Sequence, residues 1–408
     1  MRKVFENRPQ GSTTPPHWRS IPLKYLFRRS KSLGSGQEQL LSIYRDYGVI
    51  PKDSRDDNFN KASDDLSKYQ LVSQGDLVVN KMKAWQGSVA VSEYDGIISP
   101  AYFVYRPVGE IDNRFAHYLL RSSEYFQYYA SISSGVRPNQ WDLNPHAFER
   151  LEVSFPPLKE QKLIAEYLDR ETAEIDAMKD ELDRAITLIE ERFQAEIEQC
   201  FQSLEGTRMP LRSQIRRMAT GTSVTAAKFT PAAGEPGVLA TSAVFGDDLD
   251  ETAVKSVEPH EYARLTCPLR INTLLVSRMN TMNLVGKAVT VDLHLPDVYL
   301  PDRLWEVEVE QPRYIYWWTR SQSYREQIRG LAVGASDSMK TLSQQAFRSI
   351  TLPVPPVPQQ IAVAAQLDEA AKHSNALKSE LQEAKVLLKE RQKALISAAV
   401  TGRLDASD

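Results

Sequence analysis

The side chains that could carry out chemistry are few and lie far apart in the sequence. The chain has two cysteines, Cys200 and Cys267. Its six histidines are His17, His117, His146, His260, His294 and His373. A metal site needs ligands at close spacing, and a catalytic nucleophile needs a base held beside it. No such grouping is visible, so we expect surface or packing roles for these residues and no metal or disulfide framework.

Nucleotide-binding and methyl-transfer motifs are also missing from the sequence. Gly34-Ser-Gly36 lacks the third glycine of a dinucleotide-binding turn, and no phosphate-binding loop with a Gly-Lys-Ser/Thr ending is present. Asn144-Pro-His146 is only superficially similar to the Asn-Pro-Pro-aromatic motif of amino-methyltransferases. We therefore predict a binding module that is not itself an enzyme and holds no cofactor.

The composition is that of an ordinary globular protein. The chain has 408 residues, of which 42% are hydrophobic and 25% charged, and the net charge is −3. No apolar run approaches the roughly 20 residues that span a bilayer, and the basic start has no hydrophobic core after it. We expect a cytoplasmic protein. Residues 158–206 carry 6 basic against 14 acidic side chains, whereas the flanking segments are slightly basic.

The strongest pattern is an internal repeat with a constant offset of 199 residues. Phe148 to Gln161 matches Phe347 to Gln360, including a Pro-Pro pair at the same place. Further matches in this register are Gly87 with Gly286, Tyr125 with Tyr324, Gly135 with Gly334, Leu143 with Leu342, and Leu168-Asp169 with Leu367-Asp368. A unit of this size is too long for a solenoid repeat, so it predicts a duplicated module of one globular domain and one helix.

Each module changes character after its Pro-Pro pair. Before the pair, short β-type runs such as 75–79, 102–105, 272–276 and 305–309 alternate with turns, and short helices are expected around 117–120 and 314–318. After it, residues 158–203 and 358–400 contain no glycine and predict long helices.

The long helices carry coiled-coil heptads. The heptad positions that we assign to the helix seam or to partner docking are Leu168, Ile175, Leu182, Ile189, Leu367, Leu381, Leu388 and Leu395, with Ile164, Met178, Ala185, Phe193 and Ile197 filling the first seam and Ser374 as a polar break in the second. Helices of equal length, about 60 Å each, are expected to pair with each other in antiparallel fashion. The alternative is two independent amphipathic helices, each lying on its own domain.

The predicted architecture is therefore mixed α+β. Two similar globular domains, residues 1–157 and 207–356, are separated by two spacer helices, residues 158–206 and 357–408, which form an antiparallel coiled coil with a pseudo-twofold internal repeat.

This combination of motifs resembles the DNA-specificity subunit of type I restriction–modification systems. The resemblance rests on Pro156-Pro-Leu-Lys-Glu-Gln161 and Pro355-Pro-Val-Pro-Gln-Gln360, each followed by a helix, and on the C-terminal run from Lys389 to Asp405. It covers essentially the whole chain. The departure is Pro358-Gln359, where the family usually has a charged residue and Glu.

The resemblance implies that each globular domain is a target-recognition domain for one half of a split double-stranded DNA site. It also implies that two methyltransferase subunits, which bring S-adenosylmethionine, dock on the helices, and that motor–nuclease subunits join some of these complexes. In this family the subunit is not catalytic.

Residues that read DNA should lie where the two copies differ between matching flanks and should carry base- or phosphate-binding side chains. We select candidates from four such stretches, residues 80–86, 136–141, 277–283 and 335–340. We add two early stretches that we expect to be loops, residues 28–32 and 216–223. The candidates are Lys31, Ser32, Asn80, Lys81, Lys83, Trp85, Gln86, Arg137, Asn139, Gln140, Trp141, Arg216, Thr222, Arg278, Asn280, Asn283, Ser336, Ser338 and Lys340. Trp85 and Trp141 are equally compatible with packing.

Two other interpretations stay open on the sequence alone. One is a coiled-coil scaffold whose domains bind proteins, in which case Arg137→Ala and Lys81→Ala would leave DNA affinity unchanged. The other is the recognition half of a fused restriction enzyme, which the missing catalytic motifs disfavour.

Overall fold

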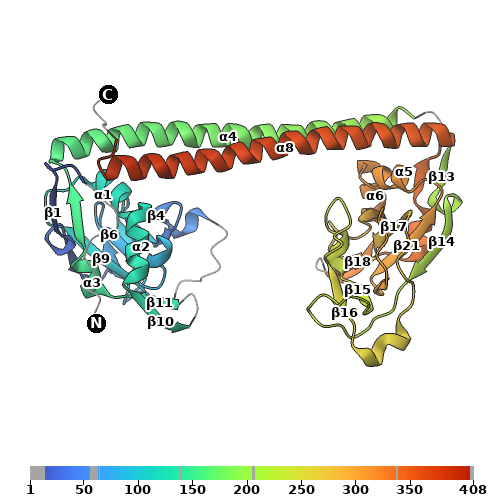
Figure 1. Cartoon of the computed structure of the whole chain (residues 1–408), viewed down its shortest axis with the longest axis horizontal. Helices are drawn as coiled ribbons and strands as arrows, with labels where there is room; N and C mark the ends of the chain where they lie inside the picture. The colour runs from blue at the N-terminus through green and yellow to red at the C-terminus, as the bar shows by residue number, and fades with distance from the viewer. Residues whose placement is uncertain are drawn as a thin grey trace. The chain divides into compact units, whose positions relative to one another are not determined.

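The computed structural model describes residues 14–55, 63, 65–137, 140–204, 207–336 and 339–404, without the side chains of residues 136, 137, 140, 335 and 336. The chain divides into two compact units, Met1–Asp183 with Gln382–Asp408, and Arg184–Leu381. Each unit contains one globular domain and segments of two long helices, α4 (Leu158–Gln202) and α8 (Val357–Val400) (Figure 1). The predicted fold class, mixed α and β with two long helices, is confirmed.

A four-stranded antiparallel sheet forms the centre of the first domain. Its strand order is β2 (Phe27–Ser30), β9 (Tyr102–Pro107), β6 (Leu77–Asn80) and β7 (Val89–Val91). Side chains of β6 point alternately into two apolar clusters, Leu77 and Val79 into one and Val78 into the other. Because both faces are covered, the central strands are mostly apolar.

The remaining elements of this domain surround the sheet. Its other strand pairs are β1 (Arg19–Pro22) with β12 (Glu152–Phe155), β3 (Leu41–Tyr44) with β4 (Gly48–Pro51), β5 (Gln70–Val72) with β8 (Gly96–Ile98), and β10 (Ser133–Arg137) with β11 (Gln140–Leu143). Its short helices are α1 (Asn113–Leu120), α2 (Ser123–Ser131) and α3 (Pro145–Glu149).

The second domain repeats the strand order of the central sheet and differs in its accessory strands. Its sheet has the order β14 (Ile215–Thr220), β21 (Leu304–Val309), β17 (Thr273–Ser277) and β19 (Ala288–Val291), again antiparallel. Its other strand pairs are β13 (Arg208–Pro210) with β24 (Thr351–Pro353), β15 (Gly237–Leu239) with both β16 (Val254–Ser256) and β20 (Val298–Tyr299), and β23 (Met339–Thr341) with both β18 (Met279–Asn280) and β22 (Val333–Ser336). Its helices are α5 (Pro312–Trp318), α6 (Gln322–Leu331) and α7 (Gln344–Ser349).

The repeated glutamine after each Pro-Pro pair joins a domain to its long helix. Gln161 and Gln360 are almost fully buried. The Nε2 group of Gln161 donates to the Pro156 carbonyl at 2.9 Å, and that of Gln360 donates to the Pro355 carbonyl at 2.8 Å. Each bond satisfies a buried carbonyl at the point where the chain enters the helix, which gives the repeated signature a structural reason.

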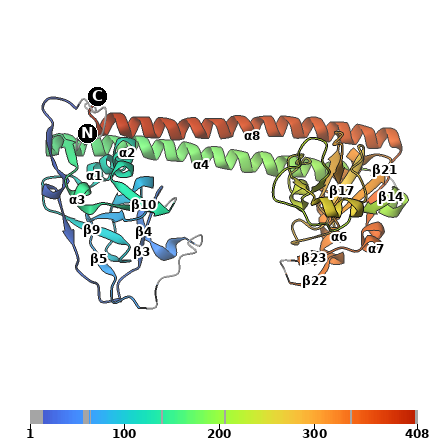
Figure 2. The ribbon, with the colours of Figure 1, turned by 60° about the horizontal axis from the view of Figure 1, so that its bottom comes forward.

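The two long helices run antiparallel. In the first unit, Lys179 on α4 donates to the Gln392 side chain on α8 at 3.1 Å, and Lys385 pairs with Asp183. In the second unit, Lys378 pairs with Glu190 at 3.4 Å. Residue numbers on α8 fall as those on α4 rise, and both views show the helices side by side (Figure 2). The alternative of two independent helices is wrong.

Both helices contribute to the core of each domain. The first core contains Leu168 from α4 and Ala399 and Val400 from α8, and the second contains Ile197 and Phe201 from α4 with further residues from α8. The α8 residues in the second core are Val363, Ala364 and Leu367. Each domain therefore packs against the start of the long helix that follows it in the sequence and against the end of the other long helix.

Burial along the helices departs from the predicted seam at Met178, which is 45% exposed. The expectation that Met178 fills the seam is wrong, because the antiparallel partner covers a narrower stripe than the heptad pattern alone suggests. Ile175 is buried, and the other seam positions are half-buried: Leu182, Ile189, Leu381, Leu388 and Leu395.

Within the part of the chain that the structure describes, none of the helices has both the length and the apolar character needed to span a membrane.

Ser374 occupies the buried seam position that Ile175 takes in the first helix. Its hydroxyl has no hydrogen-bond partner among the described residues. Because an unsatisfied buried hydroxyl destabilises the folded state, we expect Ser374→Ala to raise the free energy of unfolding by about 1 kcal/mol. Chemical denaturation of the whole chain measures this change.

The matched control for this substitution is Ser379→Ala, which removes an exposed hydroxyl from the same helix. It reports the gain in helix propensity alone and should have a clearly smaller effect. Equal effects of the two substitutions, or a destabilised Ser374→Ala variant, would contradict the prediction.

Candidate nucleic-acid interface

In the first domain, the two stretches with the most candidate residues lie together. The rings of Trp85 and Trp141 are 4.9 Å apart, and the Leu143 N–H donates to the Lys81 carbonyl at 2.9 Å. Trp85 also donates from Nε1 to the Met82 carbonyl at 3.0 Å. The loop between β6 and β7 is thereby held against the hairpin of β10 and β11, with the two tryptophans as the packed, half-exposed contact between them.

The second domain brings its equivalent stretches together by a different contact. Asn280 in β18 pairs with Lys340 in β23, and the Leu342 N–H donates to the Arg278 carbonyl at 2.9 Å. Here a short strand replaces the tryptophan pair. The same two loops therefore meet in both domains, although the residues that join them differ.

Each loop begins with a cation held over an aromatic ring. Lys81 Nζ donates to the Pro100 carbonyl and lies 4.9 Å from the centre of the Phe103 ring. In the second domain, Arg278 Nη1 donates to the Asp302 carbonyl at 3.3 Å, and its guanidinium lies 5.9 Å from the Trp305 ring centre. These two candidates are anchored to their own domains, which favours a role in positioning the loop.

The electrostatic setting of Lys81 is unusual for a surface lysine. Burial lowers the pKa of Lys81, and the neighbouring Arg29 lowers that pKa further, while Asp142 opposes both. The Arg29 guanidinium lies 4.3 Å from the same Phe103 ring, and its Nε is buried without a hydrogen-bond partner among the described residues. Two cations therefore converge beside the first loop, and an anion placed there would relieve their repulsion.

The asparagines of the loops use their side-chain oxygens locally. Asn80 Oδ1 accepts from the backbone N–H groups of Met82 at 3.0 Å and Lys83 at 3.2 Å. In the second domain, Asn280 Oδ1 accepts from the Thr281 N–H at 2.9 Å. Two-point recognition of adenine requires that oxygen as an acceptor, so this arrangement disfavours direct adenine reading by these asparagines.

Other candidates remain accessible. Lys31, Ser32, Lys83 and Asn283 are exposed, and Gln86 is half-buried. Lys340 is half-buried and donates to the Gly334 carbonyl at 3.0 Å. The side chains of Arg137, Gln140 and Ser336 are not described, and Asn139 and Ser338 lie outside the described residues.

The two early stretches that were predicted as loops are partly strands, so that prediction is wrong for residues 28–30 and 216–220. They form β2 and β14, which pair with β9 and β21. Arg216 projects from β14 and forms an ion pair with Glu310 at 3.5 Å. Thr222 follows the strand, and its hydroxyl lies 2.6 Å from that of Thr266.

Two cations that are not among the selected candidates lie near the accessible ones. One is Arg29, beside Lys81, and the other is Arg106 on β9, which donates from Nη2 to the Ser32 hydroxyl at 3.5 Å. Their positions depend on the pairing of β2 with β9, which places Arg28 opposite Arg106. A sequence without that pairing gives no reason to group them.

Helices α2 and α6 contact the loops that follow β6 and β17, respectively. Gly87 and Gly286 have φ values of 95° and 75°, and a Cβ at Gly87 would lie 2.6 Å from the Phe126 ring. At the position of Phe126, the second domain has Arg325, which donates to the carbonyls of Met282 at 2.8 Å and Val285 at 2.9 Å. The scaffold is thus the same, and the side chains that shape the loop differ.

Comparison with known proteins gives one consistent result. The family model described as the type I restriction modification DNA specificity domain matches residues 32–188. The EcoKI specificity subunit of Escherichia coli K12 is 22% identical over 365 residues, which cover 84% of this chain and 77% of that one. Residues 32–188 thus match the DNA specificity domain of type I restriction–modification systems, and the chain is similar to the specificity subunits of these systems.

Further relatives agree with this family. The StySPI specificity subunit of Salmonella potsdam is 31% identical over 93 residues, covering 23% of this chain and 20% of that one. Among solved structures, a chain from work on complex assembly and conformational transition of the type I R-M system has a TM-score of 0.73 at 15% identity, covering 96% of this chain and 99% of that one. The HsdS subunit from Thermoanaerobacter tengcongensis has a TM-score of 0.52 at 16% identity, covering 97% and 99%. These structures show the shared fold.

This likeness implies DNA target recognition as the role of the chain, with DNA and other subunits of a restriction–modification system as its partners. Among the described residues, no group of three or more His, Cys, Asp or Glu side chains could hold a metal ion.

Proposed function

We propose that each globular domain reads one half of a bipartite, asymmetric DNA site and that the helix pair sets the separation of the halves. The observation that carries this proposal is the duplicated loop pair. The two domains share the sheet order, the anchored cation and the supporting glycine, and they differ in the loop residues between these anchors. Shared scaffolds with different loops suit two different short sequences read by tethered modules.

Within this proposal, we assign phosphate contacts to the exposed cations of the first domain. These are Lys31 and Lys83. Lysine and arginine on phosphates fix the register of a protein on DNA, and base contacts select the sequence. Among the remaining candidates, the accessible loop residues Gln86 and Asn283 are proposed to face the bases. Lys81 and Arg278 are proposed to position the loops.

The proposal is tested by exchanging one loop. Residues 80–86 are replaced by the sequence of residues 277–283, which also begins next to a cation anchored over a ring. We expect the bases of one half-site to change or to lose recognition while the other half-site keeps its sequence. The reciprocal exchange is the matched control and should affect the other half. An unchanged methylation motif in both variants would contradict the assignment of these loops.

The helices are proposed to dock two methyltransferase subunits, which bring S-adenosylmethionine and methylate adenine in each half-site. Where the system has motor–nuclease subunits, they join the same assembly. This chain supplies neither the cofactor nor the catalytic groups. If the target base is flipped out of the duplex, the pocket that receives it belongs to the methyltransferase.

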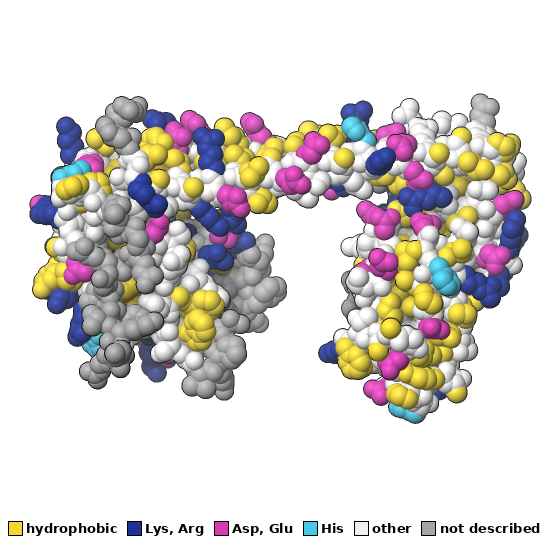
Figure 3. All heavy atoms as spheres, in the orientation of Figure 1, with side chains coloured by type: hydrophobic (Ala, Val, Ile, Leu, Met, Phe, Trp, Pro, Cys, Tyr) yellow, Lys and Arg dark blue, Asp and Glu magenta, His cyan; other side chains and the backbone are white. Residues whose placement is uncertain are grey.

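Exposed apolar side chains at repeated positions support docking on the helices. Leu188 on α4 and Leu387 on α8 are separated by the repeat offset of 199 residues and are 63% and 64% exposed. Val386 and Ile361 on α8 are also more than half exposed. Figure 3 shows hydrophobic side chains among charged ones on the helices. Single exposed leucines are common, but the same position in both modules suits two identical partners.

A further inference from the structure

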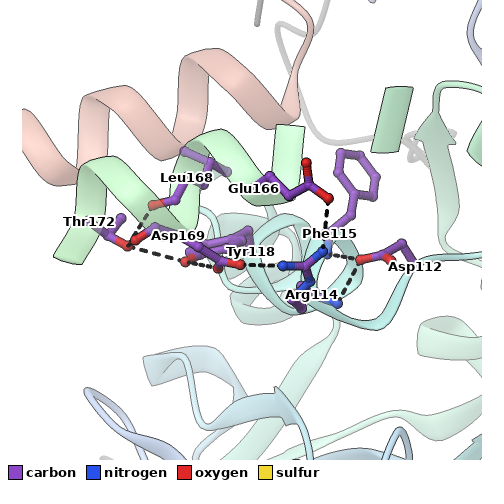
Figure 4. A network of polar contacts seen from close by, with 8 residues as sticks. All are labelled: Asp112, Arg114, Phe115, Tyr118, Glu166, Leu168, Asp169 and Thr172. Atoms are coloured by element: carbon purple, nitrogen blue, oxygen red, sulfur yellow. Dashed lines mark hydrogen bonds and ion pairs between the residues drawn. The ribbon is translucent and has the colours of Figure 1, made fainter. Parts of the chain in front are cut away.

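A single aspartate on each long helix receives two donors from the neighbouring domain. In the first unit, Asp169 on α4 accepts from Arg114 Nη1 at 2.7 Å and from the Tyr118 hydroxyl at 2.8 Å (Figure 4). Both donors come from α1 and are one helical turn apart. Burial raises the pKa of Tyr118 to about 12, so its hydroxyl keeps the proton that it donates.

The surrounding contacts hold this arrangement in place. Asp112 caps α1 by accepting from the N–H groups of Arg114 at 3.0 Å and Phe115 at 3.1 Å. On α4, the Thr172 hydroxyl lies 3.2 Å from that of Tyr118 and donates to the Leu168 carbonyl at 2.6 Å. The donors and the acceptor are therefore each fixed by their own helix.

The second unit contains the same arrangement. Asp368 on α8 accepts from Arg313 Nε at 2.6 Å and from Trp317 Nε1 at 2.8 Å. Arg313, Trp317 and Asp368 each lie 199 residues after their counterparts in the first unit. The tyrosine has been replaced by tryptophan, but the replacement still presents a hydrogen-bond donor to the same carboxylate. The chemistry of the contact has been kept although the residue has changed.

Stability alone does not explain why this contact occurs twice. Asp169 and Asp368 are 39% and 38% exposed, and ion pairs at such sites contribute little to the free energy of folding. Apolar packing next to these aspartates, which includes the buried Leu168 and Leu367, already holds each domain on its helix. Apolar packing is non-directional and does not fix the orientation of the domain. Two hydrogen-bond donors that lie one helical turn apart and bind the same carboxylate do define the angle between the domain and its helix.

We propose that these two arrangements fix the angle of each domain on its own helix. We call them the aspartate clamps: Asp169 with Arg114 and Tyr118, and Asp368 with Arg313 and Trp317. By fixing this angle, the clamps restrict which half-site separation the chain accepts. Asp169 and Asp368 are positioning residues in this account, because they act through the orientation of a domain and do not touch DNA. The inference rests on the proposed function for its consequence, while the clamps themselves rest on the contacts within each unit.

The test uses Asp169→Asn and Asp368→Asn in the full chain with its methyltransferase, together with Tyr118→Phe, which removes one donor only. We expect both half-site sequences to be kept. Selectivity for the native separation over separations one base pair shorter or longer should fall about tenfold, as expected for weakening a hydrogen bond to a charged group. Glu166→Gln is the matched control, because its contact with Arg114 is 3.7 Å long, and it should keep the native selectivity.

A second measurement separates this inference from the proposed function. Spin labels at Lys24→Cys and Glu174→Cys, both exposed and in the first unit, report the domain–helix distance when Cys200 and Cys267 are replaced by Ala. Asp169→Asn should broaden the distance distribution. An unchanged width would overturn the clamp even if methylation of a split motif is observed.

The remaining outcomes are also distinct. A broadened distribution with unchanged spacing selectivity would overturn the link to half-site separation. If the wild-type chain directs no split-site methylation, the proposed function fails, and the label distances still decide the clamp.

Discussion

Insertion of four residues after Ala185 together with four after Ala384 is expected to move the two halves of the methylated motif apart without changing their bases. The two alanines are equivalent in the repeat and lie beside the ion pair of Lys385 with Asp183. Four helical residues add about 6 Å, which corresponds to about two base pairs of DNA. Methylation at the native separation should fall about 100-fold, because tethered binding is lost when geometry prevents both domains from engaging. Sequencing that detects N6-methyladenine measures both effects.

The matched control inserts four residues in one helix only. Because the helices are paired antiparallel, this insertion shifts one seam against the other and should reduce methylation at every separation. The account is contradicted if the double insertion changes the half-site bases, or if it leaves the native separation in place.

Aspartate at positions 188 and 387 is expected to block assembly with the methyltransferase. Each leucine is exposed, and a carboxylate buried without a partner in an interface costs about 2 kcal/mol or more. This corresponds to a loss of affinity of about 30-fold or more per interface. Leu188→Asp and Leu387→Asp should weaken one partner each, and the double variant should lose both. Sedimentation of the reconstituted complex counts the bound subunits.

Two substitutions serve as controls for the added charge. Ala195→Asp and Gln382→Asp place the same charge at other exposed helix positions. They should leave assembly intact, and DNA binding by the whole chain should be unaffected in all four single variants. If the double leucine variant binds two methyltransferase subunits with native affinity, docking does not use these side chains.

The repeat made the architecture predictable from the sequence. The constant offset of 199 residues places Pro-Pro pairs, glycines and Leu-Asp pairs in matching positions, and the structure gives both domains the same sheet order. The long helices were predicted from two features, the heptads and the lack of glycine after each Pro-Pro pair. Their predicted ends agree with the structure to within a residue. Met178 was assigned to the seam wrongly, because periodicity does not show how wide a stripe the partner covers.

The interface was less predictable, because it depends on strand pairing and on local hydrogen bonds. Lys81 and Asn80 have the right chemistry for reading DNA, yet Asn80 is used within its own loop and Lys81 is anchored to the Pro100 carbonyl. Arg29 joins the cation cluster only through the pairing of β2 with β9. The aspartate clamps were partly visible, since Asp169 and Asp368 match in the repeat, but their donors lie 55 and 51 residues away in the sequence of each unit.

The anchored state of Lys81 also changes how a protein-binding scaffold is best distinguished from a DNA reader. Lys81→Ala would loosen the loop as well as remove a charge. Lys83 is exposed on the same loop, so its substitution removes charge with less effect on the fold. DNA affinity that is unchanged in Lys83→Ala combined with Lys31→Ala would favour the scaffold.

The central claim is that this chain supplies the DNA specificity of a methyltransferase complex. It is tested most directly by a genome-wide map of N6-methyladenine in cells that carry the cognate methyltransferase gene, with and without this chain. The account predicts a split, asymmetric methylated motif that appears only when the chain is present. Identical methylation in the two strains would contradict it.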